Sequence, residues 1–323
     1  MKQLSIIIVK YKSWTPLSKN LDALSEILKN QPSFEVIVID NCSGDNELAN
    51  FQAKYPVIDF YENAGNLGFA SGCNFGASKA KGEVLLFLNP DTIASEDALN
   101  KMYHRILADS QIGIVSCKQS EKASSYQKMF PSLATLFGPQ RSLYKILNSE
   151  KFKAMNCATC NCAEVSPDWI SGSVVMMTRT WFDKVSGWTE DYWLYSEDTD
   201  LSKKVANAHG KVILLCDTYI KHDHGGASRI NVKTEALTKS EVIASQHVYI
   251  QNHFVGFQKT LAHTLLLLNT LFFKGILAVF GLVFFFIPKL KVQLFLFKNC
   301  LNYYLSALSH QTWLSVRSPN YGK

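Results

Sequence analysis

The sequence contains no acidic residue after Glu241. Residues 256–323 hold seven Lys or Arg and no Asp or Glu, so the chain's excess of six positive charges lies there. Residues 1–255 carry 26 basic and 27 acidic residues and are nearly neutral. A basic surface for nucleic acid is therefore not expected on the main body, whereas a membrane-facing tail is favoured.

The sequence also lacks the glycine-rich signatures of two large enzyme classes. It has no G-x-G-x-x-G fingerprint and no Walker A sequence, which disfavours a dinucleotide-dependent dehydrogenase and a P-loop NTPase. Near the amino terminus, the apolar run Leu4–Val9 has only six residues before Lys10. Such a run is shorter than the core of a signal peptide, so we expect the main body in the cytoplasm.

The eight cysteines do not form the pattern of a disulfide framework. Five are isolated in the sequence, and a reducing compartment disfavours disulfides between them. Cys157, Cys160 and Cys162 form a C-x-x-C-x-C cluster, whose first two members have the spacing of metal ligands. No fourth ligand is evident nearby, so free thiols are favoured over a zinc site.

Short apolar runs alternate with amphipathic segments along most of the chain. Strands are predicted at residues 4–9, 34–39, 57–61, 83–88, 112–117, 169–178 and 211–215. Helices are predicted at residues 15–30, 45–55, 68–80, 96–109, 180–185, 199–209 and 235–254. This alternation predicts an α/β domain over residues 1–255, with a mostly parallel sheet covered by helices on both faces. The pattern fades over residues 118–167, which indicates a variable insertion over the site.

The tail, residues 256–323, is apolar as well as basic. Residues 261–287 are strongly apolar but contain Lys274, which a full span would place near the centre of the bilayer. Residues 292–308 form a second apolar and aromatic stretch. We therefore expect two amphipathic or hydrophobic helices in the membrane interface, rather than a transmembrane span or hairpin, or helices of a protein core.

Acidic residues stand at or near the carboxyl ends of predicted strands, where open parallel sheets bind ligands. Asp40 ends the second strand, Asp91 follows the fourth, and Glu197-Asp198 precedes a helix. Each could serve only as a turn residue or a helix cap. Together they describe a site with a base and ribose at Asp40, a metal at Asp91 and an acceptor hydroxyl at Asp198.

A hard divalent cation at this site would prefer oxygen ligands from one or two carboxylates and from substrate phosphates. Asp91 supplies a carboxylate, and Asn89 lies near it with a neutral carbonyl. His222 and His224 add imidazoles, which suit Mn²⁺ better than Mg²⁺, and exposure to solvent is the alternative for both. The segment 63–69 contains glycines, which let backbone N–H groups approach a ligand closely.

Six short motifs follow one another in a specific order. They are IIIVKYKS at residues 6–13, VIDNCS at 38–43, NLGFA at 66–70 with Asn74, LNPDT at 88–92, WISG at 169–172 and YSEDTDL at 195–201. Together they resemble the family 2 glycosyltransferases, and within these they are similar to the rhamnosyltransferase-like branch that builds O-antigen and other bacterial surface polysaccharides. The resemblance covers residues 4–255 and is weakest over 118–167.

The resemblance implies a GT-A fold and an inverting, metal-dependent transfer from a nucleotide-diphosphate sugar. Asp40 would bind the nucleobase, and Asp198, beside Glu197, would be the general base. Asp91 would bind Mn²⁺ or Mg²⁺, together with His222 or His224. Further donor-binding candidates in the motifs are Val9, Tyr11, Asn41, Asn66, Gly68, Asn74, Asn89 and Gly172. The aromatic residues that flank the acidic pair, and that would contact the sugar or acceptor unless they belong to the core, are Trp169, Trp193 and Tyr195.

The donor implied is dTDP-rhamnose or a UDP-sugar. The basic, apolar tail fits a glycan acceptor linked to undecaprenyl diphosphate, at the cytoplasmic face of the inner or plasma membrane. The protein would be peripheral or monotopic there, with the membrane surface as its partner through residues 256–323. The sequence leaves the sugar, the acceptor, the linkage and the oligomeric state open.

The sequence departs from the family pattern at two positions. Lys10 stands where a small polar residue is common, and Thr189 stands where a carboxylate is usual. The Gln-x-x-Arg-Trp signature of processive synthases is absent, which favours transfer of one sugar per binding event. The rivals are a sugar-nucleotide pyrophosphorylase, disfavoured because residues 10–14 contain no glycine, and a catalytically silent membrane scaffold.

Overall fold

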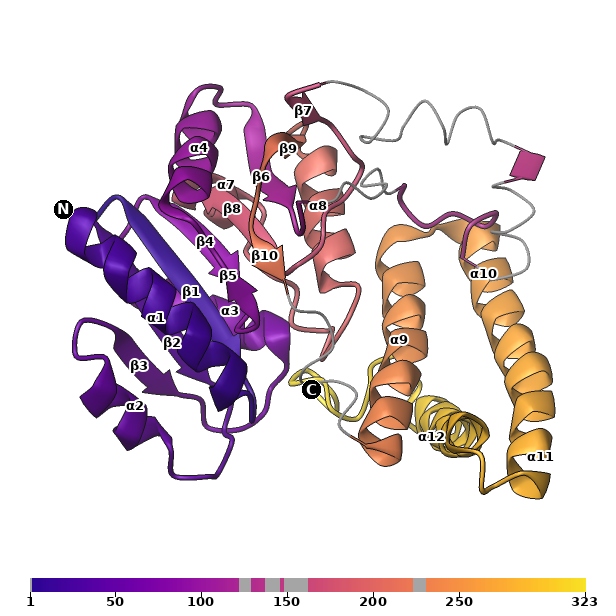
Figure 1. The fold of residues 1–323 in the computed structure, drawn as a ribbon. Helices are drawn as coiled ribbons and strands as arrows, with labels where there is room; N and C mark the ends of the chain where they lie inside the picture. The colour runs from indigo at the N-terminus through magenta and orange to yellow at the C-terminus, as the bar shows by residue number, and fades with distance from the viewer. Residues whose placement is uncertain (1, 122–128, 137–145, 148–161, 223–230) are drawn as a thin grey trace. The chain divides into compact units, whose positions relative to one another are not determined.

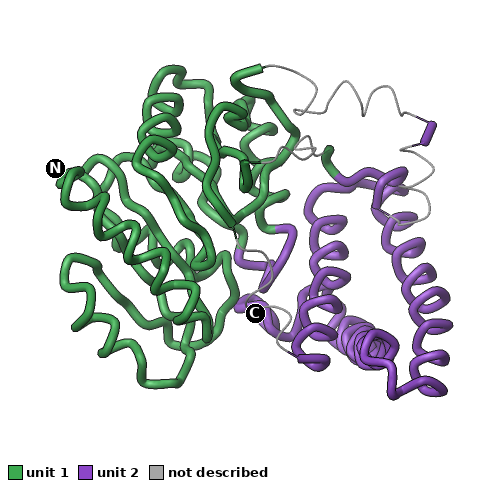
Figure 2. The backbone as a smooth tube through the Cα atoms, viewed as in Figure 1, with its two compact units in different colours: residues 1–130, 150–189, 197–226 green, residues 131–149, 190–196, 227–323 purple. Residues whose placement is uncertain are grey.

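The computed structural model describes residues 2–121, 129–136, 146–147, 162–222 and 231–323. The chain divides into two compact units (Figure 2), of which the first comprises residues 1–130, 150–189 and 197–226. The second comprises residues 131–149, 190–196 and 227–323. Helix α9 (Val232–His253) therefore belongs with the tail, although the sequence placed a boundary after residue 255.

The first unit contains an eight-stranded sheet (Figure 1). In the order β3-β2-β1-β4-β8-β6-β9-β7, its strands are Asp59–Glu62, Phe34–Asp40, Leu4–Lys10, Val84–Leu88, Val174–Thr178, Ile112–Lys118, Lys211–Tyr219 and Glu164–Val165. The four neighbours β3, β2, β1 and β4 are parallel to one another, and β6 is parallel to β9. Strand β8 is antiparallel to β4 and β6, and β7 is antiparallel to β9. The sheet is therefore mostly parallel, as predicted.

Helices cover both faces of this sheet. They are α1 (Trp14–Asn30), α2 (Leu48–Lys54), α3 (Phe69–Lys79), α4 (Glu96–Leu107), α7 (Arg179–Lys184) and α8 (Glu197–Asn207). In β1, Ile6 and Ile8 pack in one hydrophobic cluster with residues of α1 and α4, whereas Ile7 packs in a second with residues of α3, α7 and α8. Successive side chains of a strand point to opposite faces, so burial on both faces produces the continuous apolar runs seen in the sequence.

Two strands begin at least two residues later than predicted, and β9 runs to Tyr219, four residues past its predicted end. The strand expected from residue 169 begins only at Val174, because residues 171–173 make contacts outside the sheet that are described below. The strand predicted at 57–61 begins at Asp59, since Val57 is exposed and the backbone turns at Ile58. In addition, β7 lies within the predicted insertion 118–167, much of which is outside the described residues.

The second unit is helical. Its helices are α9, α10 (Gly256–Asn269), the π-helical turn η1 (Thr270–Lys274), α11 (Gly275–Val283) and α12 (Pro288–His310). Helix α12 packs on α9 through Ile243, Val292 and Leu296, and α10 packs on α9 through Leu266 and Ile250. Among the described residues, one continuous helical segment, Gly256–Val283, is long and apolar enough to cross a membrane.

The cysteines differ from expectation at one position. Cys216 is disulfide-bonded, although the sequence analysis expected no disulfide there. Among the described residues, Cys42, Cys73, Cys117 and Cys300 are free thiols. Cys157 and Cys160, the pair with metal-ligand spacing, lie outside the described residues, so the zinc question stays open.

Candidate functional site

A small two-stranded sheet brings Asp91 and His222 together. The strand β5 (Thr92–Ile93), just after the turn that follows β4, pairs antiparallel with β10 (Lys221–His222), and Thr92 lies opposite His222. As a result, Asp91 Oδ1 lies 3.0 Å from His222 Nε2, and both side chains are largely buried. His224, the other imidazole considered from the sequence, lies outside the described residues.

Gln119 orients His222 from the other side of its ring. Gln119 Oε1 lies 3.1 Å from His222 Nδ1, while Gln119 Nε2 donates a hydrogen bond to Ser173 Oγ. Because Oε1 can only accept, His222 Nδ1 carries a proton, and Nε2 is the ring nitrogen that faces the Asp91 carboxylate. At 3.0 Å, Nε2 and Asp91 Oδ1 can share a proton or, once that proton is displaced, a bound cation.

This pair fits a divalent cation of the kind that the sequence indicated. One carboxylate and one imidazole, the latter fixed by a hydrogen bond to its second nitrogen, form a common partial ligand set for Mn²⁺. No cluster of three or more His, Cys, Asp or Glu that could hold a metal occurs within the described parts of the chain. Asp91 and His222 would therefore need phosphate oxygens of a substrate to complete the coordination.

Gln119 was not among the predicted site residues. It lies one residue beyond β6, at the carboxyl end of a strand that the sequence analysis had recognised. That position was the available signal, but the sequence analysis assigned residue 118 onward to a variable insertion.

Asp198 is held by backbone N–H groups at the start of α8. Gly172 N donates to Asp198 Oδ2 at 3.0 Å, and Thr199 N donates to Asp198 Oδ1 at 2.7 Å. A Cβ atom at Gly172 would lie 3.4 Å from Asp198 Cβ and 3.6 Å from the Phe69 ring, in ordinary van der Waals contact with both. The two N–H groups fix the carboxylate in direction while part of its acceptor capacity stays available.

The segment Ser171–Ser173 connects Asp198 to the Asp91–His222 pair. Ser173 Oγ accepts from Gln119, which orients His222, and Ser173 O accepts from Asn89 N at 3.0 Å. Gly172, between the two serines, contacts Asp198. Two of the three acidic positions predicted to form one site therefore belong to one connected group of residues.

Glu197 differs electrostatically from its neighbour. Its side chain is buried, and burial together with the nearby charge of Asp198 raises the pKa of Glu197 to about 8. Its Oε2 has no hydrogen-bond partner among the residues that the structure describes. The two residues before it, Tyr195 and Ser196, have backbone φ angles of 74° and 65°. Residues other than glycine rarely adopt this left-handed region. Such local strain is often found at functional sites.

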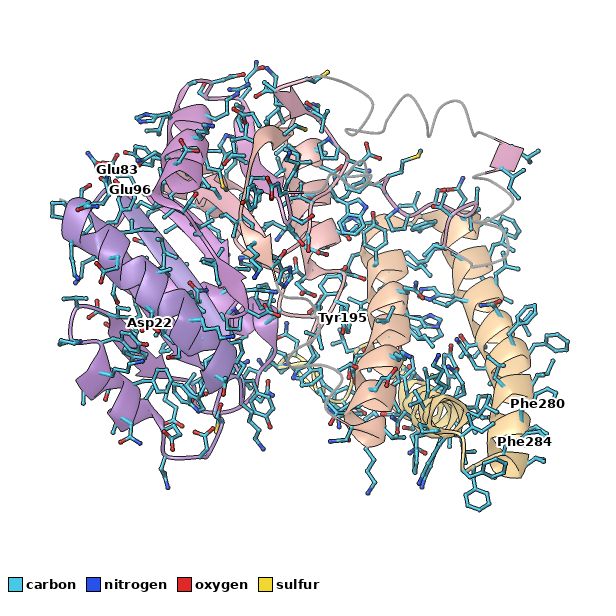
Figure 3. The ribbon with its side chains drawn as sticks, in the orientation of Figure 1. Asp22, Glu83, Glu96, Tyr195, Phe280 and Phe284 are labelled. Atoms are coloured by element: carbon cyan, nitrogen blue, oxygen red, sulfur yellow. The ribbon has the colours of Figure 1, made fainter. Side chains whose placement is uncertain are left out.

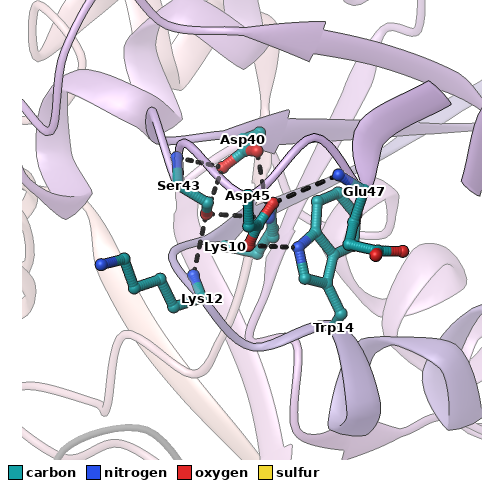
Figure 4. A network of polar contacts seen from close by, with 7 residues as sticks. All are labelled: Lys10, Lys12, Trp14, Asp40, Ser43, Asp45 and Glu47. Carbon is teal, nitrogen blue, oxygen red and sulfur yellow. Dashed lines mark hydrogen bonds and ion pairs between the residues drawn. The ribbon is translucent and has the colours of Figure 1, made fainter. Parts of the chain in front are cut away.

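Asp40 is enclosed by its own chain (Figure 4). Lys10 Nζ lies 3.0 Å from Asp40 Oδ2 and donates to Ser43 Oγ at 2.8 Å, while Ser43 N and Oγ both donate to Asp40 Oδ1. Lys10 Nζ also lies 3.0 Å from the centre of the Trp14 ring. Burial lowers the pKa of Lys10, and the hydrogen bond to Asp40 opposes this. A nucleobase N–H would therefore have to share Oδ2 with Lys10, and the nucleobase contact expected for Asp40 stays a prediction.

The asparagines of the NLGFA region brace a loop. Asn41 Nδ2 donates to Gly68 O at 2.9 Å and to Asn66 Oδ1 at 3.2 Å, and Asn63 Nδ2 donates to Asn41 Oδ1 at 2.9 Å. Gly68, at φ 90°, precedes α3. Asn74 exchanges hydrogen bonds with the backbone of Trp188. Asn41, Asn66 and Asn74 therefore have structural hydrogen bonds within the protein, and their expected contacts with a donor stay predictions.

The comparison with known families decides the identity of the chain. The family described as "Glycosyl transferase family 2" matches residues 5–170, just over half of the chain. The chain belongs to glycosyltransferase family 2. A second family, described as "N-terminal domain of galactosyltransferase", matches residues 155–224, which include Asp198 and His222.

The curated relatives of this glycosyltransferase are bacterial. An uncharacterized glycosyltransferase, YfnE of Bacillus subtilis, is 32% identical over 46% of this chain and 40% of its own length. An uncharacterized glycosyltransferase of Haemophilus influenzae is 30% identical over 35% of this chain and 37% of its own length, so the chain spans well under half of both proteins. An N-acetylglucosaminyl-diphospho-decaprenol L-rhamnosyltransferase of Mycobacterium tuberculosis is 24% identical over 64% of this chain and 71% of its own length.

Solved structures show the same fold at low identity. GalNAc-T7, crystallised with UDP, GalNAc and Mn²⁺, superposes with a TM-score of 0.54 at 15% identity, over 75% of this chain and 48% of that one. The mannosyltransferase PcManGT of Pyrobaculum calidifontis, in complex with GDP-Man and Mn²⁺, gives the same values over 91% and 84%. The predicted GT-A fold is thereby confirmed.

The remaining predicted residues of the glycosyltransferase have varied surroundings. Val9 packs in the core, where a Cβ on Gly72 would lie 2.6 Å from it, so only its backbone could meet a donor, whereas Tyr11 is 42% exposed. In the first unit, the Trp169 indole donates to Met129 O at 3.0 Å. In the second unit, Arg317 lies 5.5 Å from the Trp193 ring. Contacts of Trp169, Trp193 and Tyr195 with sugar or acceptor stay predictions.

Proposed function

We propose that this glycosyltransferase transfers one sugar per binding event, with inversion, from a nucleotide-diphosphate sugar to a hydroxyl group of a glycan acceptor. The observation that supports the proposal is the connection of Asp198, through Ser171–Ser173, to the Asp91–His222 pair. Such a transfer needs a base for the acceptor hydroxyl and a group that binds the diphosphate, and one connected segment supplies candidates for both.

Asp198 is the general base of the proposed reaction. Inversion requires the acceptor hydroxyl to lie in line behind the anomeric carbon, and a carboxylate within hydrogen-bond reach takes its proton as the new bond forms. Gly172 N and Thr199 N hold both carboxylate oxygens in a fixed direction, so little orientation remains to be gained on binding. Glu197, whose pKa is raised to about 8, stays protonated at neutral pH and does not compete for that proton.

A divalent cation would be held by Asp91 and His222. When bound, it would neutralise the negative charge that develops on the leaving nucleoside diphosphate. Gln119 keeps Nε2 of His222 directed at this position. The proposal is supported by the mannosyltransferase and GalNAc-T7 structures, which contain Mn²⁺, although those proteins share only 15% identity with this chain.

For the donor we infer dTDP-rhamnose or a UDP-sugar, and for the acceptor a glycan on a polyprenyl diphosphate, such as undecaprenyl diphosphate. The named activity of the mycobacterial relative supports this choice. The product would then belong to O-antigen or another surface polysaccharide, made at the cytoplasmic face of the membrane. The basic tail, residues 256–323, fits a site of action at an anionic membrane surface.

Turnover of a panel of dTDP-, UDP- and GDP-sugars with Mn²⁺ tests the proposal. The wild-type enzyme should consume one donor, and Asp198→Asn should lose turnover by roughly a hundredfold or more while it still binds that donor. Unchanged turnover in Asp198→Asn would remove the base from the mechanism. Consumption of no donor would favour the silent scaffold, and formation of a sugar nucleotide from a sugar phosphate would favour the pyrophosphorylase.

A further inference from the structure

A continuous set of apolar side chains is exposed on the second unit. Thirteen large apolar residues between Leu268 and Ile287 are more than a third exposed, with Phe272 at 63%, Val279 at 61% and Phe286 at 70%. We call these exposed side chains of residues 268–287 the apolar ridge. Figure 3 shows Phe280 and Phe284 at the outer edge of this unit. The ridge ends in four consecutive residues, Phe284–Ile287, in the turn between α11 and α12.

The opposite side of α11 is fixed by protein. Ala278 and Gly281 are buried, and α11 packs on α12. The approach is close, because a Cβ atom on Gly281 would lie 2.5 Å from Leu290 O. The ridge is therefore not a face that a small rotation of α11 would hide, and its exposure follows from the packing of the other face.

The ridge has the spacing of a helix that lies flat on an apolar phase. Phe272, Ile276, Val279, Phe280 and Val283 recur every three or four residues and form a stripe along the helix. The charges that follow this stripe in the chain are positive, since Lys289 and Lys291 come just after the exposed residues 284–287 and no acidic residue follows Glu241. A contiguous exposed surface of this many large apolar side chains marks an interaction site.

We propose that the apolar ridge inserts into one leaflet of an anionic lipid bilayer, with α11 in the plane of the interface. The stripe supplies the apolar face, and Lys289 and Lys291 reach the lipid phosphates.

The geometry favours insertion into one leaflet over a span. The helical part of the ridge, residues 268–283, is about 24 Å long, shorter than the roughly 30 Å of a bilayer core. A span through Gly256–Val283 would also carry Lys274 into the hydrocarbon and strip α10 from α9, although Ala262 and Leu266 are buried against α9. The ridge therefore refines the expectation for residues 261–287: their first part is core, and their second part is the membrane surface.

Vesicle flotation of the full-length protein, without any sugar donor, tests this surface separately from the transfer reaction. The protein should float with vesicles of phosphatidylglycerol and phosphatidylethanolamine, and weakly with phosphatidylcholine alone. The triple substitution Phe284→Ser, Phe285→Ser and Phe286→Ser should lower partition into both vesicle types by roughly a hundredfold. The double substitution Lys289→Gln and Lys291→Gln should lower partition into the anionic vesicles alone, by about fivefold per lysine, and added salt should mimic it.

A matched control removes exposed apolar residues elsewhere. Val57→Ser with Leu107→Ser, at sites 65% and 52% exposed in the first unit, should partition like the wild type. Circular dichroism and thermal unfolding of the triple variant should equal those of the wild type, because the substituted rings are exposed.

Three kinds of result would overturn the proposal. The first is a flotation result: the wild-type protein does not float, or the triple variant floats equally well. The second is a lipid-free oligomer, measured by light scattering, that the triple variant dissociates, since a second copy would then cover the ridge. The third is reaction of Phe285→Cys with a membrane-impermeant thiol reagent enclosed inside the vesicles, since that residue would then have crossed the bilayer.

Discussion

The buried Lys10–Asp40 pair gives the sharpest stability prediction. The Lys10 side chain is fully buried and the Asp40 side chain is 3% exposed, so neither charge is solvated by bulk water. Lys10→Met keeps the length and apolar stem of the side chain but removes its charge and both polar contacts, to Asp40 and Ser43. The Asp40 carboxylate would remain buried with only the Ser43 hydrogen bonds to compensate it.

The expected cost is large, because one partner of a buried ion pair is left alone. Removing one partner of such a pair should lower the free energy of unfolding by about 3–5 kcal/mol. For a unit of this size, each kcal/mol lowers the midpoint of thermal unfolding by about 2–4 °C, so the variant should melt roughly 6–20 °C lower. Denaturant unfolding, followed by tryptophan fluorescence, measures the free energy directly.

Two further variants separate charge burial from other effects. Lys10→Met with Asp40→Asn removes both charges and keeps an acceptor for Ser43, so it should recover most of the lost stability. Lys29→Met breaks the surface pair with Glu26, in which both side chains are more than 65% exposed, and should cost less than about 1 kcal/mol. A loss below about 1 kcal/mol for Lys10→Met itself would refute the argument that this pair is a closed, unsolvated unit.

Three other substitutions test the site. Because the pKa of Glu197 is raised from 4.5 to about 8 in the folded protein, its contribution to stability is present below pH 4.5 and is lost as the pH rises through 8. Glu197→Gln should therefore be more stable than the wild type at pH 9 but not at pH 5, and parallel pH profiles in denaturant unfolding would contradict this. Gln119→Leu should weaken Mn²⁺ binding by roughly 10–100-fold, measured by calorimetry with a nucleoside diphosphate present to complete the coordination, because His222 loses the contact that fixes its Nδ1 proton. Unchanged Mn²⁺ affinity would show that Gln119 does not orient the ligand. Asp91→Ala should abolish the gain in nucleotide affinity that Mn²⁺ confers, whereas a wild-type gain in that variant would place the metal elsewhere.

The sheet could be predicted because its determinants are local. A strand buried on both faces is apolar at nearly every position, so the runs that became β1, β2 and β4 stand out without any knowledge of their partners. The buried exceptions Ser5 and Glu35 are hydrogen-bonded to each other. Their parallel pairing then brings their carboxyl ends to one edge, with Lys10 opposite Asp40 in register. The same register explains the buried ion pair between Lys10 and Asp40, which the sequence analysis did not predict.

The contacts around His222 could not be predicted in the same way. They depend on β5 and β10, two strands of two residues each, which are too short to produce an apolar pattern. Gln119 and Ser173 meet only because β6 and β8 are neighbours in the sheet while lying far apart in the sequence. The predicted strand over 169–178 was wrong at its start for the same reason, since the Gly172 backbone is used by Asp198 and not by a neighbouring strand.

The tail shows a different limit of sequence patterns. Leu266 and Val279 belong to one apolar stretch and have similar hydropathy, yet Leu266 is 3% exposed and Val279 is 61% exposed. An apolar helix face has the same periodicity whether a second helix or a lipid leaflet covers it, so periodicity alone cannot separate the two. What separates them is the partner: α9 covers the first part of the stretch and α12 covers only the inner side of α11. The outer side then has to be assigned from charge, and the absence of any acidic residue after Glu241 favours an anionic surface over a protein one.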